Sequence, residues 1–311
     1  MSTPESSTPR TLFDSRLAEY FKGRTPLPVA VVYPCDTVSL RGAVLAAHRG
    51  YIRPILIGPE ARISELAASC GLDIEDIDIK DVELDTDAAA EAAQMAKNGA
   101  VKALMKGNLH TNDLMRALVA KEAGLRTSRR MSHVFAIDHP NYHKLVLVTD
   151  AALNIAPDLM TKRDITQNAI EFAHRLGTPR PKVAILAAVE TVEDGIDSTL
   201  HAAALCKMAD RKQIKGGMLD GPLALDNALL AEAARIKGIE SEVAGDADVL
   251  VVPNYEAGNV LAKEMEHLGG ARTGGLVLGA KVPVILTSRA DTEVARLASC
   301  LLALAAVHGV T

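Results

Sequence analysis

The chain has 311 residues, of which 48% are hydrophobic and 3% aromatic, and its formal net charge is −5. This length and composition allow a large aliphatic core, in one big domain or two ordinary ones. The negative charge and the absence of long Lys/Arg blocks exclude a nucleic-acid-binding surface as the expected role. Four widely spaced cysteines without a CxxC pair argue against a disulfide framework or zinc cage and favour a reducing, cytoplasmic compartment.

The two ends of the chain differ in character. Residues 1–25 begin with the polar, Ser/Pro-rich stretch "MSTPESSTPR", which predicts a partly flexible leader and not a signal peptide. Residues 297–310, "LASCLLALAAVHGV", are apolar but too few to span a membrane. They predict a packed C-terminal helix, and no membrane partner is expected.

Short apolar runs alternate with helical patterns along most of the chain. The strand-like runs are residues 29–34, 53–58, 103–107, 182–189 and 248–253. The helical patterns that follow them are residues 36–49, 59–70, 111–124, 198–210 and 257–268. Such alternation is typical of parallel βαβ units whose strands are buried on both faces. The predicted fold class is therefore α/β.

Two pairs of adjacent strand candidates interrupt this alternation. Residues 132–139 and 142–150 are joined by a Pro-Asn turn, which predicts an antiparallel hairpin, and residues 274–280 are followed directly by 282–288. We interpret the two pairs as crossovers between two α/β lobes. The first lobe would be residues 1–140 plus 286–311, and the second residues 141–285. A ligand is expected in the cleft between them, at the carboxyl ends of strands.

The stretch "LMKGNLHTNDLMR" places five candidate binding residues between a strand and a helix: Lys106, Gly107, Asn108, His110 and Thr111. Gly107 would let backbone approach a ligand, and the amides at the start of the helix favour an anion. Thr111 or Asn112 could instead simply cap that helix. An ordinary strand-to-helix turn explains the stretch equally well.

Further candidates lie at other strand ends. Arg126, Arg129 and Arg130 precede a strand and suggest phosphate or carboxylate recognition, although a solvated basic loop explains each one alone. His133, on the apolar strand itself, is interpreted as a satisfied core or interface side chain and not as a ligand. Two later strands end in polar residues near glycine, and some of these residues are explained by helix capping: Asp220, Gly221, Gly258 and Asn259.

The segment "KVPVILTSRADT" ends a strand with Ser288, Arg289 and Asp291. A helix cap explains Asp291 or Thr292 without any catalytic role.

No metal site is predicted in the hairpin, because Asp138, His139 and His143 have no further ligand at matching spacing.

Six ordered stretches resemble the phosphate acetyltransferase and phosphate butyryltransferase family, and the similarity extends over nearly the whole chain from about residue 28. They are "LMKGNLHTNDLMR", "RRMSHVFAIDHP", "AAALCKMADR", "LDGPLALDNA", "VAGDADVLVVPNYEAGNVLAKE" and "PVILTSRADT". The resemblance implies a two-lobed isocitrate/isopropylmalate dehydrogenase-like fold with the active site in the interdomain cleft. It also implies acyl transfer between coenzyme A and inorganic phosphate, with acyl-CoA as a substrate and no bound cofactor. Family members commonly form homodimers or larger homo-oligomers.

The resemblance assigns catalysis first to Ser288, near the reacting carbonyl, and Arg289, as a phosphate or CoA contact. The "KGNLHT" turn and Arg130 are similar to the family's first-lobe face of the cleft. In acetyl-transferring members the base is an Asp one or two helical turns after the Ser-Arg pair, whereas here that segment reads "TEVARL", with Ala295 near the position. Asp291 is therefore a candidate base, with a helix cap as the equal alternative.

Three functions follow as hypotheses. The first is a phosphate acyltransferase that uses short acyl-CoA, from acetyl to butyryl, and the overall look of "TSRADT" and "LMKGNLHT" favours the butyryl branch. The second is a hydroxy-acid dehydrogenase of the same fold, which would need clustered Asp ligands for a metal. The third is a non-catalytic regulatory or oligomerising module, which the altered base region keeps open.

Overall fold

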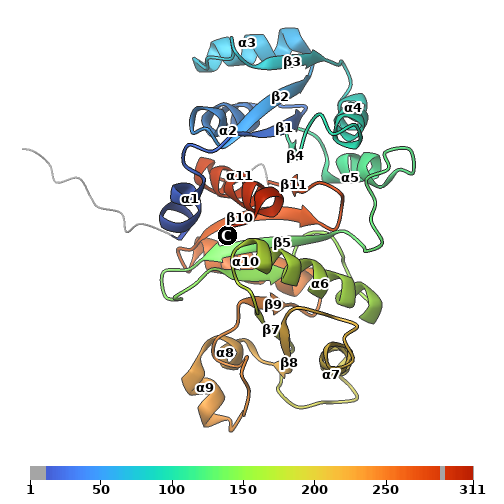
Figure 1. Cartoon of the computed structure of the whole chain (residues 1–311), viewed down its shortest axis with the longest axis vertical. Helices are drawn as coiled ribbons and strands as arrows, with labels where there is room; N and C mark the ends of the chain where they lie inside the picture. Colours follow the sequence, from blue (N-terminus) through green and yellow to red (C-terminus); the bar gives the residue numbers. More distant parts are fainter. Residues whose placement is uncertain (1–11, 288–290, 311) are drawn as a thin grey trace, which may run out of the picture.

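The computed structural model describes residues 12–287 and 291–310. Among these residues the strands form one 11-stranded sheet, in the order β3-β2-β1-β4-β11-β10-β5-β6-β9-β7-β8. In chain order they are β1 (Leu27–Val32), β2 (Ile52–Gly58), β3 (Asp78–Asp81), β4 (Ala103–Lys106), β5 (Ser132–Asp138), β6 (Val146–Thr149), β7 (Lys182–Leu186), β8 (Met218–Leu223), β9 (Val249–Val251), β10 (Arg272–Leu278) and β11 (Val284–Ile285). The sheet extends along the long axis of the molecule, from β3 at the top of Figure 1 to β8 near the bottom, and the predicted α/β class is confirmed.

Helices cover both faces of the sheet. They are η1 (Phe13–Ala18), α1 (Glu19–Phe21), α2 (Thr37–His48), α3 (Glu60–Cys70), α4 (Asp85–Lys97), α5 (Thr111–Val119), α6 (Leu159–Arg175), α7 (Asp197–Asp210), α8 (Leu225–Leu229), α9 (Ala231–Ile236), α10 (Tyr255–His267) and α11 (Glu293–His308). Successive strand residues point to opposite faces. Val29 and Val31 thus share a core with α2 and α11, while Ala30 and Val32 share one with α4 and α5.

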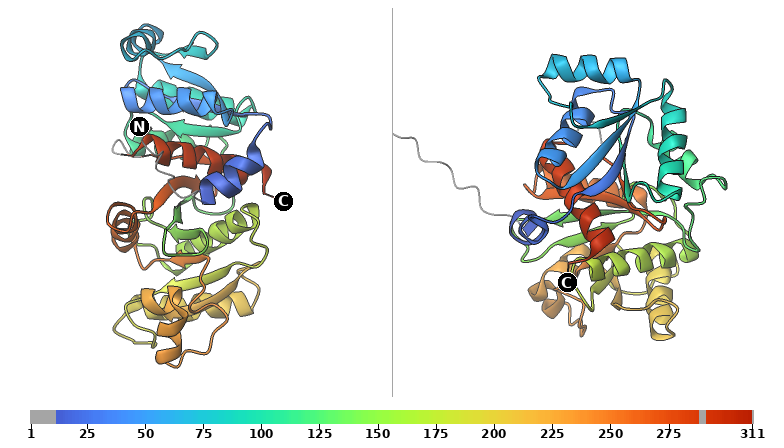
Figure 2. Two further views of the ribbon diagram at one scale, coloured as in Figure 1. Left: turned by 90° about the vertical axis from the view of Figure 1, so that its left-hand side faces the viewer. Right: turned by 45° about the horizontal axis from the view of Figure 1, so that its top comes forward.

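The strand pairing confirms both interruptions of the βα alternation. β5 is antiparallel to β6, and β10 is antiparallel to β5 and β11. On either side of this central group the strands are parallel, with β1 between β2 and β4, and β9 between β6 and β7. Figure 2 shows the N-terminal strands and β7–β8 at opposite ends of the molecule. The central antiparallel strands therefore join two parallel halves.

The observed elements depart from the prediction in places. α5 ends at Val119, earlier than the predicted residue 124, and β11 covers only Val284 and Ile285 of the predicted 282–288. The sequence patterns did not identify β3 or α4. β3 lies at the edge of the sheet with mostly exposed residues, so it lacks the apolar run of a buried strand.

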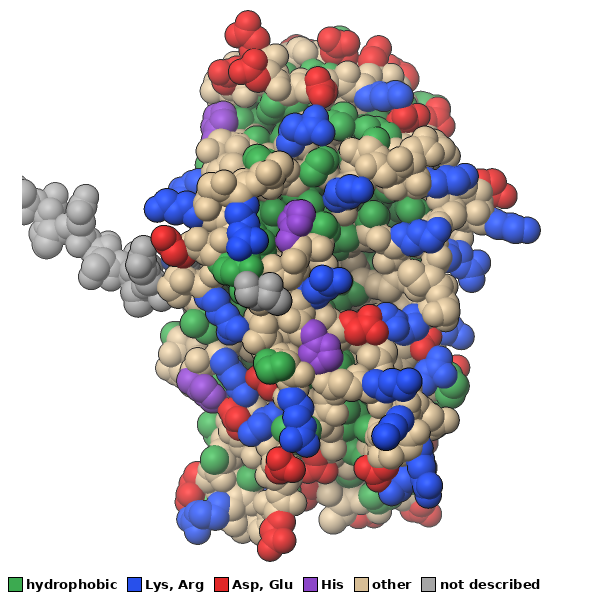
Figure 3. Space-filling model, in the orientation of Figure 1, with side chains coloured by type: hydrophobic (Ala, Val, Ile, Leu, Met, Phe, Trp, Pro, Cys, Tyr) green, Lys and Arg blue, Asp and Glu red, His purple; other side chains and the backbone are tan. Residues whose placement is uncertain are grey.

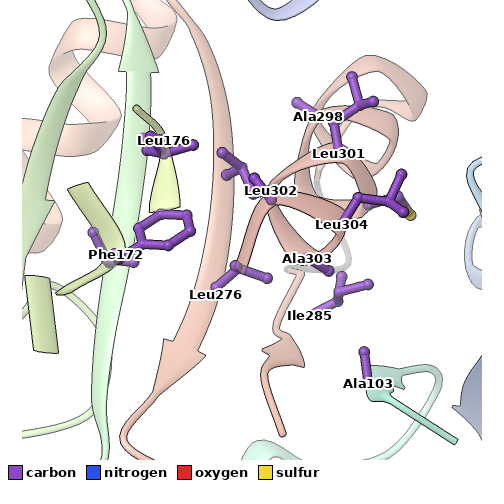
Figure 4. Close-up of a cluster of buried hydrophobic side chains, with 14 of the residues drawn as sticks. Ala103, Phe172, Leu176, Leu276, Ile285, Ala298, Leu301, Leu302, Ala303 and Leu304 are labelled. Carbon is purple, nitrogen blue, oxygen red and sulfur yellow. The ribbon is translucent and has the colours of Figure 1, made fainter. Parts of the chain in front are cut away.

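Helix α11 confirms the predicted packed C-terminal helix. Figure 4 shows its Leu302 toward Phe172 of α6 and Leu176, the C-cap of that helix, and its Ala303 toward Ile285 of β11. Gly274 of β10 permits this packing, because a Cβ there would lie 2.9 Å from Leu302 Cδ1 and 3.0 Å from the Ala298 backbone. In the part of the chain that is described, no helix combines the length and hydropathy that crossing a membrane requires.

The amino ends of β6, β7 and β9 carry a network of ion pairs. The Asp246 carboxylate lies 2.9 Å from Lys144 Nζ, 2.8 Å from Lys182 Nζ and 3.0 Å from His143 Nε2. Asp248 pairs with Lys144 at 2.8 Å and accepts a hydrogen bond from the Lys182 amide. At this end of the sheet, charged side chains thus satisfy one another.

Candidate functional site

A cavity of about 580 Å³ lies at the carboxyl ends of β4 and β11. One wall comes from the β4–α5 turn and the segment after β11, and the other from β5, the turn after β6 and α10. The lining residues are Lys106, Leu109, His110, Thr111, Asn112, His133, Phe135, Ala152, Tyr255, Asn259, Ala262, Lys263, Glu266, His267, Leu286, Thr287 and Asp291. The cavity thus joins five predicted site residues from distant parts of the sequence: Lys106, His110, Thr111, Asn259 and Asp291.

The β4–α5 turn positions Lys106 and the start of α5. Lys106 is 6% exposed, and its Nζ donates to the Gly107 carbonyl at 3.2 Å. A Cβ on Gly107 would lie 2.4 Å from the Val32 carbonyl oxygen and 2.6 Å from that of Tyr33. The glycine is therefore explained by its close approach to the end of β1. The Asn108 amide donates to the Tyr33 carbonyl at 2.7 Å, which fixes the turn against β1.

The start of α5 faces the cavity through His110, Thr111 and Asn112. His110 occupies the N-cap position, and no side chain of the described residues caps the helix there. The expected capping by Thr111 or Asn112 is therefore wrong. Amides in the first turn of a helix point outward and attract negative charge. The cavity is thus bordered by a helix start suited to an anion.

The segment after β11 resolves the alternative for Asp291. Thr292 is the N-cap of α11, and its Oγ1 accepts a hydrogen bond from the Ala295 amide at 3.2 Å. Asp291 is thus not the cap and lines the cavity instead. Ser288 and Arg289 lie outside the described residues. The flanking Thr287 is buried and accepts a 2.7 Å hydrogen bond from Arg296 Nη1. Burial lowers the pKa of Arg296, an effect that the charge of Asp291 partly offsets.

The opposite wall is held by the turn after β6. The buried Asp150 carboxylate accepts hydrogen bonds from the amides of Ala152, Leu153 and Asn154 at 2.9–3.2 Å. Gly258 of α10 brings the helix against this turn, since a Cβ there would lie 2.9 Å from the Asp150 carbonyl oxygen. Asn259 Nδ2 donates to the Ala151 carbonyl at 3.2 Å. α10 is thereby fixed with Asn259 and Lys263 along the cavity.

Comparison with known proteins identifies the family of the chain. Residues 82–304 match the family model described as phosphate acetyl/butaryl transferase. The chain is 54% identical to the phosphate acetyltransferase of Rhizobium meliloti over 288 residues, which are 93% of this chain and 91% of that protein. The chain belongs to the phosphate acetyl/butyryl transferase family. The predicted family resemblance is therefore confirmed.

Two further relatives of this family extend the comparison. The phosphate butyryltransferase of Clostridium acetobutylicum is 40% identical over 282 residues, covering 91% of this chain and 94% of that protein. The crystal structure of a branched-chain phosphotransacylase from Enterococcus faecalis V583 superposes with a TM-score of 0.79 at 29% identity, covering 91% of this chain and 99% of the other. The mixed α/β fold is thus shared with a phosphotransacylase of known structure.

Several predicted site residues lie away from the cavity. Arg130 lines a separate cavity of about 490 Å³, together with Arg126 and Arg129. Asp220 and Gly221 lie on the edge strand β8, six strands away from β11 in the sheet order, and Asp220 lines yet another cavity. Gly107, Asn108 and Gly258 shape the walls without lining the cavity. The structure therefore brings together only part of the predicted set.

One lining residue, His133, was interpreted from sequence as core. It is 1% exposed, which agrees with that interpretation, yet its ring also lines the cavity. Its Nδ1 has no hydrogen-bond partner among the described residues. Burial lowers the pKa of His133 to about 4, although the nearby Asp150 carboxylate acts in the opposite direction. The imidazole is therefore neutral at pH 7.

Basic and acidic side chains lie together around the cavity, whereas they are more separated on the opposite surface. Lys106, His110 and Lys263 line the cavity together with the acidic Glu266 and Asp291. Figure 3 shows the other side of the sheet, where α6 and α11 lie, with Lys and Arg across its middle and Asp and Glu mostly toward its ends. The described residues contain no group of three or more His, Cys, Asp or Glu side chains able to hold a metal ion.

Proposed function

We propose that the chain transfers a short acyl group between coenzyme A and inorganic phosphate, giving acyl phosphate and free CoA. Its membership of the phosphate acetyl/butyryl transferase family supports this reaction. The observation that supports a location for the reaction is the cavity lined by Lys106, the start of α5 and Asp291. Asp291 follows Ser288 and Arg289 closely in the sequence.

The reaction requires a phosphate oxygen to attack the thioester carbonyl, after which the CoA sulfur leaves and takes up a proton. In the reverse direction the thiol loses that proton and its sulfur attacks the acyl phosphate. Lys106 and the α5 amides would hold phosphate oxygens, because both offer positive charge at one wall. Arg289 would contact phosphate or CoA, Ser288 would hydrogen-bond near the carbonyl, and Asp291 would accept the thiol proton.

The acyl chain would lie against the apolar part of the cavity. That part is formed by Leu109, Phe135, Ala152, Ala262 and Leu286. The chain is more similar to the phosphate acetyltransferase (54% identical) than to the phosphate butyryltransferase (40% identical), which favours acetyl transfer. The residues of the "TSRADT" stretch favour butyryl transfer instead. One methylene changes binding by only about 1–3 kcal/mol, so we expect overlapping activity with both. Relative kcat/KM values for acetyl-, propionyl- and butyryl-CoA measure this preference.

We further propose a two-lobed organisation like that of isocitrate/isopropylmalate dehydrogenases. Residues 1–140 with 286–311 would form one lobe and residues 141–285 the other, with acyl transfer in the cleft between them. The positions of the β4–α5 turn and α10 on opposite walls of the cavity support this division, because the turn belongs to the first lobe and α10 to the second. β5, in the wall with α10, belongs to the first lobe. Any substrate contact of Arg130, Asp220 and Gly221 would be with a part of the substrate that lies far from the reacting carbonyl. A cytoplasmic homodimer or larger homo-oligomer completes the proposal.

The test measures acyl phosphate and free CoA after mixing the protein with acetyl- or butyryl-CoA, with and without phosphate. We expect phosphate-dependent release of CoA in equal amounts with acyl phosphate, and its loss in Arg289→Ala with an unchanged melting temperature. No turnover with any acyl-CoA would favour a regulatory or oligomerising module. Turnover of a hydroxy acid with a nicotinamide cofactor would favour a dehydrogenase. Full activity of Arg289→Ala would remove the role given to Arg289.

A further inference from the structure

His133 occupies a central place in the sheet beside the cavity. On β5 it pairs with Val277 of β10, which pairs with Val284 of β11. Residues paired in this way share one face of the sheet. Since Val277 and Val284 belong to the core under α4 and α5, His133 projects to the same face, where the cavity lies.

Two neighbours hold the imidazole ring in position. A Cβ on Gly275 would lie 2.8 Å from Nε2 and 3.1 Å from Cε1 of His133. The tip of the ring therefore lies over β10, the strand next to β5 on the side of β11. A residue larger than glycine at position 275 would fill this space. Phe135 contacts the ring edge to face, with the ring centroids 4.4 Å apart. The ring is thus fixed by packing, and Gly275 provides its space.

The ionisation state of His133 defines what the ring can do. Because burial keeps the imidazole neutral, it carries one N–H donor and one lone pair. Nδ1 is buried without a described partner. An orphaned N–H is rarer in proteins than an acceptor with spare capacity, so we assign the proton to Nε2. The donor is then at the end of the ring that lies over β10.

We propose that His133 donates a hydrogen bond from Nε2–H to the acyl oxygen of the thioester, and that this bond strengthens as the oxygen gains charge in the tetrahedral intermediate. The proposal rests on the acyl transfer proposed above. His133 keeps its proton throughout, because the thiol proton goes to another group and the oxygen loses its charge when the intermediate collapses. A fixed neutral donor suits this task, since it needs no reorganisation during the reaction.

Kinetics of three variants test the proposal. Loss of one donor to such an oxygen typically reduces kcat about 10²- to 10³-fold. We expect a fall of that size in His133→Ala, with little change in KM for phosphate. His133→Gln, whose amide nitrogen reaches the position of Nε2, should recover more activity than His133→Asn, whose amide reaches that of Nδ1. His139→Ala is the matched control, because His139 lies at the far end of β5 against Gly269 and should keep wild-type kcat.

A direct measurement accompanies the kinetics. Without phosphate, [1-¹³C]acetyl-CoA bound to the protein should show a carbonyl infrared band at lower wavenumber in the wild type than in His133→Ala or His133→Asn. Equal carbonyl bands, a kcat within threefold of wild type in His133→Ala, or an effect confined to the KM for phosphate would each overturn the proposal. If His133→Ala does not fold, His133→Gln and His133→Asn decide by the same criteria. An inactive wild type would instead refute the acyl transfer itself.

Discussion

The two ends of the strands around the sheet's centre use charge in opposite ways. At the amino ends of β6, β7 and β9, Asp246 and Asp248 pair with Lys144 and Lys182, and no cavity is needed to explain them. At the carboxyl ends of β4 and β11, Lys106 and Asp291 lie along a cavity with the start of α5. Carboxyl strand ends are where α/β proteins place their ligands. The difference supports the chemical role that we propose for the second group and favours a structural role for the first.

The strongest test of this comparison is Asp291→Asn. If Asp291 is the general base, kcat should fall about 10²- to 10⁴-fold, because the amide cannot take up the thiol proton. The melting temperature should fall only slightly, because the variant loses the charge near the buried Arg296 but keeps the cap of α11 on Thr292. Steady-state kinetics and thermal unfolding check both statements. A kcat near that of wild type would leave Asp291 without a catalytic role.

Lys106→Met is expected to have the next largest effect. The substitution keeps much of the side-chain volume but removes the charge that would contact phosphate. A hydrogen bond to a charged group contributes about 1.5–3 kcal/mol, so KM for phosphate should rise roughly 10- to 100-fold. KM for acyl-CoA should change less. Lys263→Met, on the exposed α10 wall, is the matched control with a smaller effect, and equal effects of the two variants would argue against phosphate at Lys106.

Sequence patterns identified most of the fold because buried strands carry their own signal. The run 103–107, for example, is fully buried in β4 and continuous in apolar residues up to Lys106. The strand order carries no such local signal. Asp220 and Asn259 both follow apolar runs, yet β8 is an edge strand and only Asn259 reaches the cavity. His133 was missed since an inward-facing residue on an apolar strand is typical of core, and its partner Gly275 is 142 positions away in the chain.

Thr292→Ala separates capping from chemistry at the carboxyl ends. Loss of a Thr N-cap typically costs about 1 kcal/mol, so the free energy of unfolding should fall by that amount. Asp291 stays in place. Because the loss in stability is small, kcat should remain within about threefold of wild type. Chemical denaturation and kinetics measure the two effects. A large loss of kcat without loss of stability would show that Thr292 acts in the reaction.

The smallest expected effect belongs to the amino ends, in Asp246→Asn. Burial alone would raise the pKa of Asp246, but hydrogen bonds from Lys182 and Lys144 outweigh it and lower the pKa to about 2. Because the folded-state pKa is depressed, the stabilisation is present above the unfolded pKa near 3.9 and is lost as pH falls toward 2. The Asp246 side chain is 39% exposed, so solvent screening limits the effect to below about 1 kcal/mol.

Denaturation of Asp246→Asn and wild type from pH 7 down to pH 2 measures this contribution. The two free energies of unfolding should differ at pH 7 and converge in acid, while kcat at pH 7 stays that of wild type. Lys212→Gln, at an exposed position, controls for the loss of a surface charge. If Asp246→Asn reduced kcat as Asp291→Asn should, or raised KM for phosphate as Lys106→Met should, the contrast between the two strand ends would fail, because both would then belong to the chemistry.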